Sequence, residues 1–467
     1  MAFNSFYFWM LFPLIFAVYW LIPVNKTLTK KIFLILVSYL LYLNWNPVYS
    51  LILIWVTIIT WLGGFFLRNR NVYLSILLSV LSLAPLLIFK YGDFLNQNLN
   101  ELLYLLGLKF ELPGLNYAIP IGISFYSFQA IGYMLDVYHK RTSVERNLVD
   151  YTLFVSFFPQ IMSGPISKSD ELIPQIKQLR NFDYEMGKQG LKWLLWGMFI
   201  KIVIADRLGL FVDTVYSNYT HYNGTTCFVA SLFYTIQIYC DFCGYSLMAI
   251  GIAATLGFKL INNFRRPYFA VSITDFWRRW HISLTRWLTQ QVYIPLGGNR
   301  CSKIRNYWNI FLTFLVSGIW HGANWTFIFW GVFHGVIQIM EKLLGLTKYE
   351  GHHAVLKLSR IVFTFLLVNI AWIFFRMPTI KDAFEFISSF FYMNGLPDLS
   401  DFGGNALIMT TISVLILFFK DCRDEFFPSR FKFLNSPIVR FPTYVVLFCM
   451  IIAFGVLDGG QFIYVKF

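Results

Sequence analysis

Two histidines lie inside stretches of the sequence that are otherwise typical of membrane-spanning helices. His281 lies in FWRRWHISLTRW (residues 276–287), and His321 lies in SGIWHGANW (residues 317–325). An ionisable side chain is costly to place in the low-dielectric interior of a membrane, so such a residue is a functional candidate. A neutral imidazole can take a proton from a hydroxyl group and pass it on. We therefore expect chemistry in these two segments.

Small residues surround His321 and predict close helix packing. Gly318 and Gly322 flank it, so another helix can approach the backbone there. The apolar tract 311–340 would be about 45 Å long as one helix, which exceeds the thickness of a bilayer core. We therefore predict a break at residues 322–324, which would leave the imidazole near a discontinuity, where cavities form. The alternative is a structural histidine that packs two helices together.

For His281 and for His334, a further histidine in an apolar segment, a structural role is the alternative to a catalytic one. His281 follows two arginines and could simply anchor an aromatic belt at the membrane interface. The functional alternative is that it faces inward and binds or orients a substrate. His334 lies within the small-xxx-small pattern of residues 331–335, so we expect it to have a structural role.

The composition predicts one multi-pass membrane domain. Of the 467 residues, 57% are hydrophobic, 20% are aromatic and 13% are charged. An ordinary soluble domain has about twice this charged fraction. No polar stretch is long enough to form a separate soluble domain. We expect a single domain over residues 1–467, all-α, with about eleven spanning helices and some re-entrant or interfacial helices.

Basic residues in the short loops predict how the chain is oriented. The net charge is +14, and basic loops at 25–31, 68–71 and 139–147 are spaced two spans apart. The positive-inside rule places these loops and the basic run 259–305 in the cytoplasm, and the N-terminus on the extracytoplasmic side of the plasma (inner) membrane. This distribution favours membrane lipid over nucleic acid as a partner. It does not distinguish lipid from a polyanionic cofactor.

The most basic run also contains the least span-like segment. Residues 276–293 interleave tryptophan with arginine, which predicts an amphipathic helix at the membrane face or a short re-entrant helix. Pro295 should end that helix, and the pair Gly297 and Gly298 permits a tight turn.

Two further polar features lie in the apolar run around residue 241. We expect Asp241 to pair with a buried arginine or lysine, or to accept hydrogen bonds from the backbone. Cys240 and Cys243 match the Cys-x-x-Cys pattern, but no second pair or nearby histidine completes a metal site. We therefore expect no bound metal.

Taken together, three blocks of the sequence resemble the membrane-bound O-acyltransferase family, in its bacterial alginate O-acetyltransferase branch. The similarity runs from about residue 1 to 376, and the blocks, in order, are FWRRWHISL at 276–284, YIPLGGNR at 293–300 and SGIWHGANW at 317–325. The resemblance implies spanning helices that enclose a tunnel, with His321 as the near-invariant family histidine. His281 stands where other members have Asn, Asp or His. Cys240 and Cys243 depart from the branch pattern.

The resemblance implies transfer of an acetyl group, with acetyl-CoA as the donor from the cytoplasm and no permanently bound cofactor. Transfer from a thioester to a hydroxyl needs a base and donors for the oxyanion. We expect His321 to be the base and His281 to hold the donor or the oxyanion. The resemblance also implies an extracytoplasmic acetyltransferase partner protein and a polysaccharide acceptor. Basic residues predicted to bind the phosphates of coenzyme A are Arg278, Arg279, Arg286 and Lys259, together with Arg265 and Arg266.

Three other functions stay open at this point. One is D-alanyl transfer to teichoic acid from a carrier protein, which the YIPLGGN block disfavours. A second is a proton-coupled transporter that uses His321 and Asp241 as a relay. A third is a membrane scaffold without catalytic activity.

Overall fold

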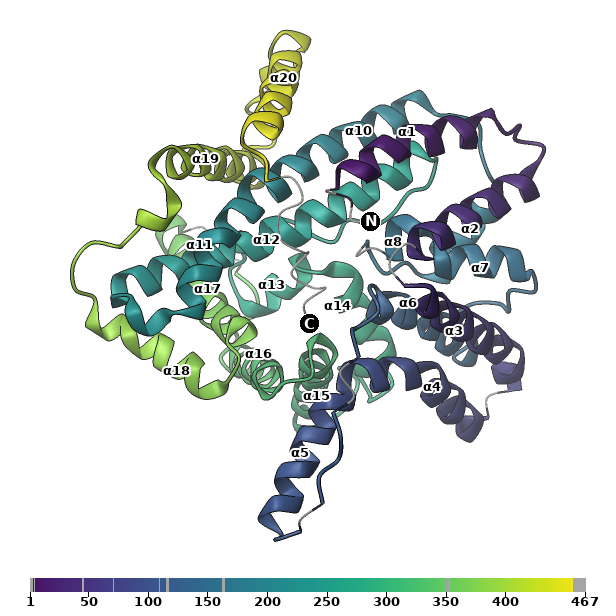
Figure 1. The fold of residues 1–467 in the computed structure, drawn as a ribbon, viewed down its shortest axis with the longest axis horizontal. Helices are drawn as coiled ribbons and strands as arrows, with labels where there is room; N and C mark the ends of the chain where they lie inside the picture. The colour runs from purple at the N-terminus through teal and green to yellow at the C-terminus, as the bar shows by residue number, and fades with distance from the viewer. Residues whose placement is uncertain are drawn as a thin grey trace.

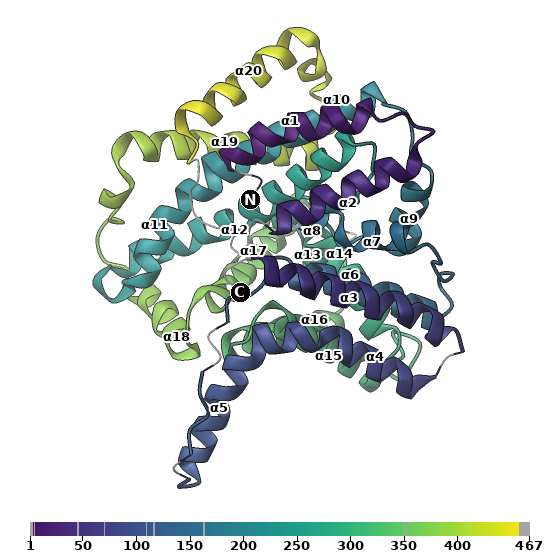
Figure 2. The same cartoon turned by 45° about the vertical axis from the view of Figure 1, so that its right-hand side comes forward.

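The structure is a computed structural model, and over the residues that it describes the regular secondary structure is entirely helical. These are residue 3 and residues 5–43, 46–69, 71–108, 110–114, 117–161, 164–349, 351 and 353–456, and no β-strand occurs within them. The predicted all-α class is confirmed. Figures 1 and 2 show the helices gathered around a central region, with α5 protruding from the body.

The N-terminal helices begin at polar caps and run through apolar sequence. The side chains of Ser5, Asn46 and Asn71 each accept a hydrogen bond from a backbone N–H in the first turn of the helix that follows. The fourth and fifth helices are joined by a π-helix, η2, and together form one apolar helix of 34 residues. These elements are α1 (Phe6–Leu21), α2 (Thr27–Leu43), α3 (Pro47–Phe66), η1 (Leu67–Asn69), α4 (Val72–Leu86), η2 (Leu87–Tyr91) and α5 (Gly92–Leu105).

The middle of the chain contributes the central helix, α12, whose most apolar stretch is entirely buried. Glycines let α10 pack closely against α12. A Cβ at Gly190 would lie 2.7 Å from the carbonyl oxygen of Gly251, and a Cβ at Gly197 would lie 2.7 Å from the carbonyl oxygen of Gly244. The elements are α6 (Ile123–Tyr138), α7 (Leu148–Ser156), α8 (Phe158–Ile161), α9 (Ser169–Lys177), α10 (Tyr184–Met198), the π-helix η3 (Phe199–Ala205), α11 (Asp206–Ser217), η4 (Tyr219–His221) and α12 (Gly224–Thr255).

A buried charge cluster joins α12 to η3 and α11. The ammonium of Lys201 lies 2.5 Å from a carboxylate oxygen of Asp241 and 2.6 Å from one of Asp206. All three side chains are less than a tenth exposed. The predicted pairing of Asp241 with a buried basic residue is confirmed, because a charge this far from water must be compensated.

The C-terminal half places short helices at the centre. Figures 1 and 2 both show α13 and α14 in the middle, surrounded by longer helices. The elements are η5 (Pro267–Phe269), α13 (Ile273–Arg279), α14 (Ile282–Leu288), the π-helix η6 (Thr289–Tyr293), α15 (Lys303–His321), α16 (Trp325–Leu343), α17 (Ala354–Arg376), α18 (Ile380–Ser388), η7 (Ser389–Tyr392), η8 (Ser400–Phe402), α19 (Gly404–Phe426), η9 (Lys432–Asn435) and α20 (Pro437–Phe454).

Several helices are suited to crossing a membrane. Six helical segments of the described chain are long and apolar enough to span a bilayer, and the predicted multi-pass organisation is confirmed. Our figure of about eleven spans stays a prediction, since other helices such as α1 are shorter. The six segments are Pro47–Asn69, Val72–Leu105, Gly224–Thr255, Ala354–Arg376, Gly404–Phe426 and Pro437–Phe454.

Candidate functional site

His321 is the last residue of α15, immediately before the predicted break. Helix α15 ends there and α16 begins at Trp325, with the Asn324 side chain accepting a hydrogen bond of 3.0 Å from the Thr326 N–H. The predicted break at residues 322–324 is thus confirmed. An asparagine N-cap and a glycine supply the local signals for it, because both favour non-helical backbone.

Glycines bring α15 and α16 into close contact just before the break. A Cβ at Gly318 would lie 2.4 Å from the Phe327 carbonyl oxygen, and a Cβ at Gly331 would lie 2.5 Å from that of Phe314. No side chain fits in these spaces, so the close helix approach predicted around His321 is confirmed. The packing fixes where the end of α15 stands.

The imidazole of His321 lies in an aromatic environment. The residue is 2% exposed, and its ring centroid lies 4.8 Å from that of Trp320, 4.9 Å from that of Trp330 and 5.1 Å from that of Phe375. Such walls exclude water, which strengthens any electrostatic interaction inside them.

Two more histidines share these tryptophans. His281 is fully buried, with its ring centroid 5.8 Å from that of Trp320, and His334 is fully buried, 4.7 Å from that of Trp330. We call His281, His321 and His334 the histidine cluster. Both predicted catalytic residues therefore lie together, and His334, which we expected to be structural, lies beside them. Among the described residues, no group of three or more histidines, cysteines and acidic residues is placed to hold a metal ion.

His281 lies in an unusual backbone conformation. Its φ is +43° and its ψ is 54°, the left-handed region, which costs a residue with a Cβ about 1–2 kcal/mol. The following turn is held by Asn263, which accepts hydrogen bonds of 3.0 Å from the Ile282 N–H and 3.1 Å from the Ser283 N–H. Such strain persists only where the surrounding structure imposes it, and it is often found at functional sites.

This conformation corrects one prediction. Residues 276–293 do not form one helix, because the left-handed turn at His281 separates α13 from α14, and η6 follows. The predicted tight turn beyond them is confirmed, since Gly297 has a φ of +117° and Gly298 one of +55°.

A cavity of about 370 Å³ leads toward the histidine cluster. Its lining includes the exposed side chains of Arg278 and Lys342. It also includes the buried residues Ser317 and Trp277. Ser317 lies one turn before His321 on the same face of α15. The indole of Trp277 donates a hydrogen bond of 3.3 Å to Nδ1 of His334. The cavity thus runs from basic residues at the surface to side chains next to the cluster.

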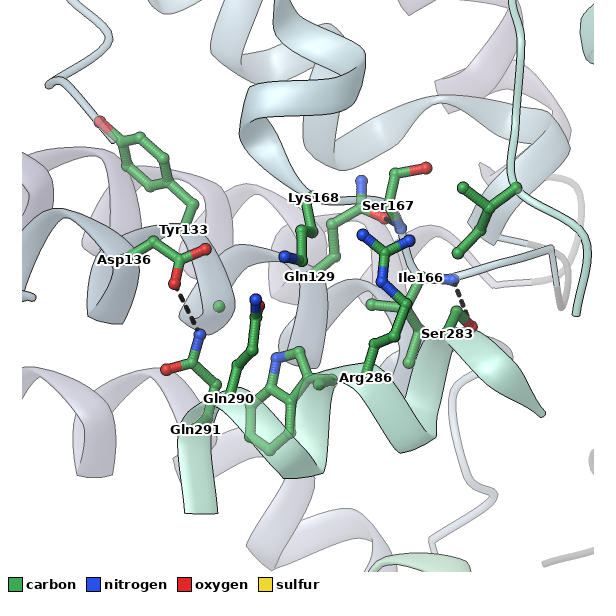
Figure 3. Close-up of a pocket in the computed structure, with 13 residues that line it drawn as sticks. Gln129, Tyr133, Asp136, Ile166, Ser167, Lys168, Ser283, Arg286, Gln290 and Gln291 are labelled. Carbon is green, nitrogen blue, oxygen red and sulfur yellow. Dashed lines mark hydrogen bonds between the residues drawn. The ribbon is translucent and has the colours of Figure 1, made fainter. Parts of the chain in front are cut away.

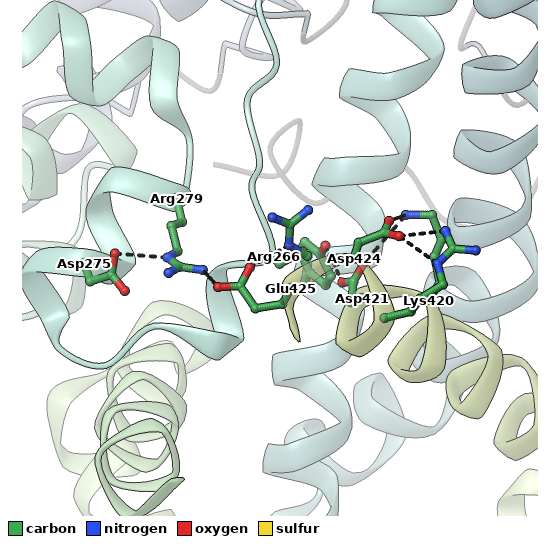
Figure 4. A network of polar contacts seen from close by, with 9 residues as sticks. Arg266, Asp275, Arg279, Lys420, Asp421, Asp424 and Glu425 are labelled. Carbon is green, nitrogen blue, oxygen red and sulfur yellow. Dashed lines mark hydrogen bonds and ion pairs between the residues drawn. The ribbon is translucent and has the colours of Figure 1, made fainter. Parts of the chain in front are cut away.

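The arginine that follows Arg278 is engaged elsewhere. Arg279 pairs with Asp275 at 3.0 Å and with Glu425 at 2.7 Å, and Arg266 pairs with the other oxygen of Glu425 at 2.7 Å (Figure 4). These ion pairs connect α13 and the preceding loop to the end of α19. A guanidinium that already pairs with two carboxylates has fewer free N–H groups and less uncompensated charge with which to bind a phosphate.

The remaining predicted donor-binding residues lie outside the larger cavity. Arg286 lines a second, water-sized pocket of about 20 Å³ with Gln129 and Lys168 (Figure 3). It also pairs with Glu171 at 2.5 Å. Lys259 is exposed, and its backbone N–H donates to the side chain of Gln175. Of the basic residues predicted to bind the phosphates of coenzyme A, Arg278 alone lines the 370 Å³ cavity.

One buried basic residue at the site was missed from the sequence. Lys90, in η2, is 8% exposed and donates a hydrogen bond of 2.8 Å to the Trp320 carbonyl oxygen. It is close enough to interact electrostatically with His321, as are His281 and His334. The sequence did contain a signal. Lys90 ends an apolar run on the side predicted to be extracytoplasmic, where the positive-inside rule disfavours lysine.

The fold and site define a class of protein: a multi-pass membrane enzyme with a buried histidine centre beside a basic cavity. The chain belongs to the membrane-bound O-acyltransferase family, whose model matches residues 73–377. It is therefore an O-acyltransferase. The matched range includes His281, His321, His334 and the cavity lining.

Two relatives named for O-acetylation cover most of the chain, and one named for D-alanyl transfer covers less than half of it. A probable alginate O-acetylase, AlgI, of Pseudomonas aeruginosa is 35% identical over 94% of this chain and 83% of its own length. A peptidoglycan O-acetyltransferase of Helicobacter pylori is 35% identical over 80% of this chain and 76% of its own. A teichoic acid D-alanyltransferase of Streptococcus thermophilus is 30% identical over 46% of this chain and 55% of its own.

Proposed function

We propose that this protein moves acetyl groups from cytoplasmic acetyl-CoA to the other side of the membrane, where they O-acetylate a polysaccharide. The observation that carries the proposal is the cavity that connects the exposed Arg278 to Ser317, one turn from His321. The relatives named for alginate and peptidoglycan O-acetylation support both the acetyl group and a glycan as the final acceptor.

The cavity suits a donor with an anionic head and a narrow reactive arm. Its volume of about 370 Å³ lies within the usual range for small-molecule sites. Arg278 and Lys342 at its exposed side can bind phosphates by charge-assisted hydrogen bonds. Its wall also includes Thr285, Thr289 and Thr313 in addition to the buried Ser317, so a thioester arm can lie against polar side chains.

The reaction needs one proton transfer at the buried end. In our proposal His321 accepts the proton of the acceptor hydroxyl while that oxygen bonds to the thioester carbonyl carbon. The carbon–sulfur bond then breaks, and His321 returns the proton to the departing thiolate. His281 holds the thioester or the developing oxyanion. The acceptor hydroxyl in this step belongs to an extracytoplasmic partner protein. That partner then transfers the acetyl group from its own ester to a hydroxyl of the polysaccharide and recovers its free hydroxyl.

The test compares histidine variants in cells at equal membrane protein levels. We expect His321→Ala to lower the acetyl content of the extracellular polysaccharide by roughly 100-fold or more, the usual loss when a general base is removed. His281→Ala should lower it less. His221→Ala, which changes an exposed histidine of η4, serves as the matched control and should have no effect. Unchanged acetylation in His321→Ala would contradict the proposal.

The partial match to a teichoic acid D-alanyltransferase supports one second candidate, D-alanyl transfer. The two functions differ in the donor. Inside-out membrane vesicles supplied with labelled acetyl-CoA should incorporate label into polysaccharide if acetyl transfer is correct. Incorporation only from D-alanyl carrier protein would favour the second candidate.

A further inference from the structure

Lys90 is a buried lysine without a carboxylate partner among the described residues. It lies at the π-helix that interrupts the 34-residue apolar helix, and it is 8% exposed. The buried Lys31 and Lys201 are neutralised, since Lys31 pairs with Asp150 at 2.6 Å and Lys201 pairs with two aspartates. The buried Lys30 instead lies over the rings of Tyr19 and Trp20. Within the described residues no carboxylate lies within ion-pair distance of Lys90, and its hydrogen-bond acceptor is a backbone carbonyl. When the side chain is protonated, no neighbouring carboxylate therefore cancels its charge.

That carbonyl belongs to Trp320, in the last turn of α15. The last four carbonyls of a helix have no partner within the helix and carry the negative end of its dipole. Lys90 donates to the Trp320 carbonyl at 2.8 Å, and the hydroxyl of Tyr91 donates to the carbonyl of Ile319. Two consecutive residues of η2 thus hold the turn that presents His321. Short π-helical segments within longer helices are frequent at functional sites.

The same lysine lies beside the indole that the two histidines share. Its Nζ is 5.7 Å from the centroid of the Trp320 ring, whose neighbours are His281 and His321. In a water-excluded site a charge at this range acts strongly on its surroundings. Of the residues that act electrostatically on His321, Lys90 is the one whose side chain is ordinarily a cation.

We propose that Lys90 is a positioning residue of the acyl-transfer site: it fixes the last turn of α15 and supplies positive charge that stabilises the developing oxyanion. This inference rests on the proposed function. Negative charge appears on the carbonyl oxygen when the acceptor oxygen bonds to the acyl carbon, and it disappears when the carbon–sulfur bond breaks. In this role Lys90 acts in its protonated form, and it neither gains nor loses a proton during these two steps. Preorganised positive groups of this kind commonly contribute about 100- to 1,000-fold to rate.

The experiment separates charge from packing. Initial rates of label transfer from acetyl-CoA are measured in inside-out vesicles that carry the wild type, Lys90→Met, Lys90→Arg or Tyr91→Phe at equal levels. We expect Lys90→Met to lower kcat about 100-fold with little change in the KM for acetyl-CoA. Lys90→Arg should recover part of that loss because it keeps the charge. Tyr91→Phe removes only the neighbouring hydrogen bond to α15, so its kcat should fall by no more than a few-fold relative to the wild type.

Two results would overturn the inference. The first is full activity of Lys90→Met. The second is that Lys90→Met, Lys90→Arg and Tyr91→Phe are all equally inactive, which would show that these residues matter only for packing. Should Lys90→Met not accumulate in the membrane, Lys90→Gln takes its place, since it can still donate to Trp320 without a charge. His321→Ala is run in the same assay. No label transfer by the wild type would refute the proposed function, and full activity of His321→Ala would refute His321 as the base. An inactive His321→Ala beside a fully active Lys90→Met would refute only the role of Lys90.

Discussion

His281 and His321 contact the same indole, that of Trp320, with ring centroids 5.8 Å and 4.8 Å from it. One histidine immediately precedes α14 and the other ends α15, so the tryptophan contacts two segments that are forty residues apart in sequence. Two imidazoles held on one rigid ring keep a constant separation. An acyl-transfer centre needs such a constant geometry, because small misplacements of reacting groups lower the rate severely.

The left-handed backbone at His281 makes a prediction about stability. An asparagine tolerates this conformation, whereas a β-branched residue does not. We expect His281→Val to be less stable than His281→Asn by about 1–2 kcal/mol, measured by thermal unfolding of the purified protein in detergent. The same two substitutions at the exposed His221, which has no positive φ, should differ by much less. Equal unfolding temperatures for the two His281 variants would contradict the strain.

The buried cluster around Lys201 makes a second prediction. Lys201→Met would leave Asp206 and Asp241 buried without their shared cation, so we expect a loss of about 3–5 kcal/mol in the free energy of unfolding. Lys381→Met is the matched control. The Lys381 side chain is 83% exposed, and its pairing at 3.6 Å with Glu385 should contribute about 0.5 kcal/mol or less. Similar unfolding midpoints for the two variants would disprove a structural role for the cluster.

The close contact between α15 and α16 predicts that Gly318 cannot be replaced by a residue with a side chain without loss of stability. A Cβ there would lie 2.4 Å from a backbone carbonyl that cannot move without shifting α16. We expect Gly318→Ala to destabilise the protein by about 1–3 kcal/mol and to displace His321, so acetyl transfer should fall as well. At Gly404, the first residue of α19, a Cβ meets nothing within 4 Å. Gly404→Ala should therefore change neither the stability nor the acetyl-transfer activity. If Gly404→Ala lowered both as much as Gly318→Ala does, the close contact at Gly318 would not be the cause.

The basic rim of the cavity predicts a donor-binding effect. Arg278→Gln should raise the KM for acetyl-CoA by roughly 10- to 100-fold with a smaller effect on kcat, because it removes a charge-assisted hydrogen bond worth about 1.5–3 kcal/mol. Initial rates in inside-out vesicles over a range of acetyl-CoA concentrations measure this. Arg286→Gln changes the arginine of the other pocket and should alter the KM little. The reverse ranking of the two variants would place the donor in the smaller pocket.

Several features of this protein could be predicted because they depend on local sequence or on an unavoidable energetic demand. The break after His321 follows from the length of the apolar tract and from the glycine and asparagine within it. The partner of Asp241 follows from the cost of burying a lone carboxylate, although the sequence did not say which basic residue it would be. The multi-pass helical class follows from composition alone.

The tertiary structure decided what depends on contacts between distant segments. The helix expected over residues 276–293 is interrupted at His281, because hydrogen bonds from the following turn to Asn263 hold a conformation that local propensity disfavours. His334 joins the histidine cluster because α16 folds back on α15, and Lys90 reaches Trp320 across 230 residues of sequence. Helical periodicity records which residues share a face of one helix. It carries no information on which faces meet, since that depends on how the buried surfaces of all the helices fit together.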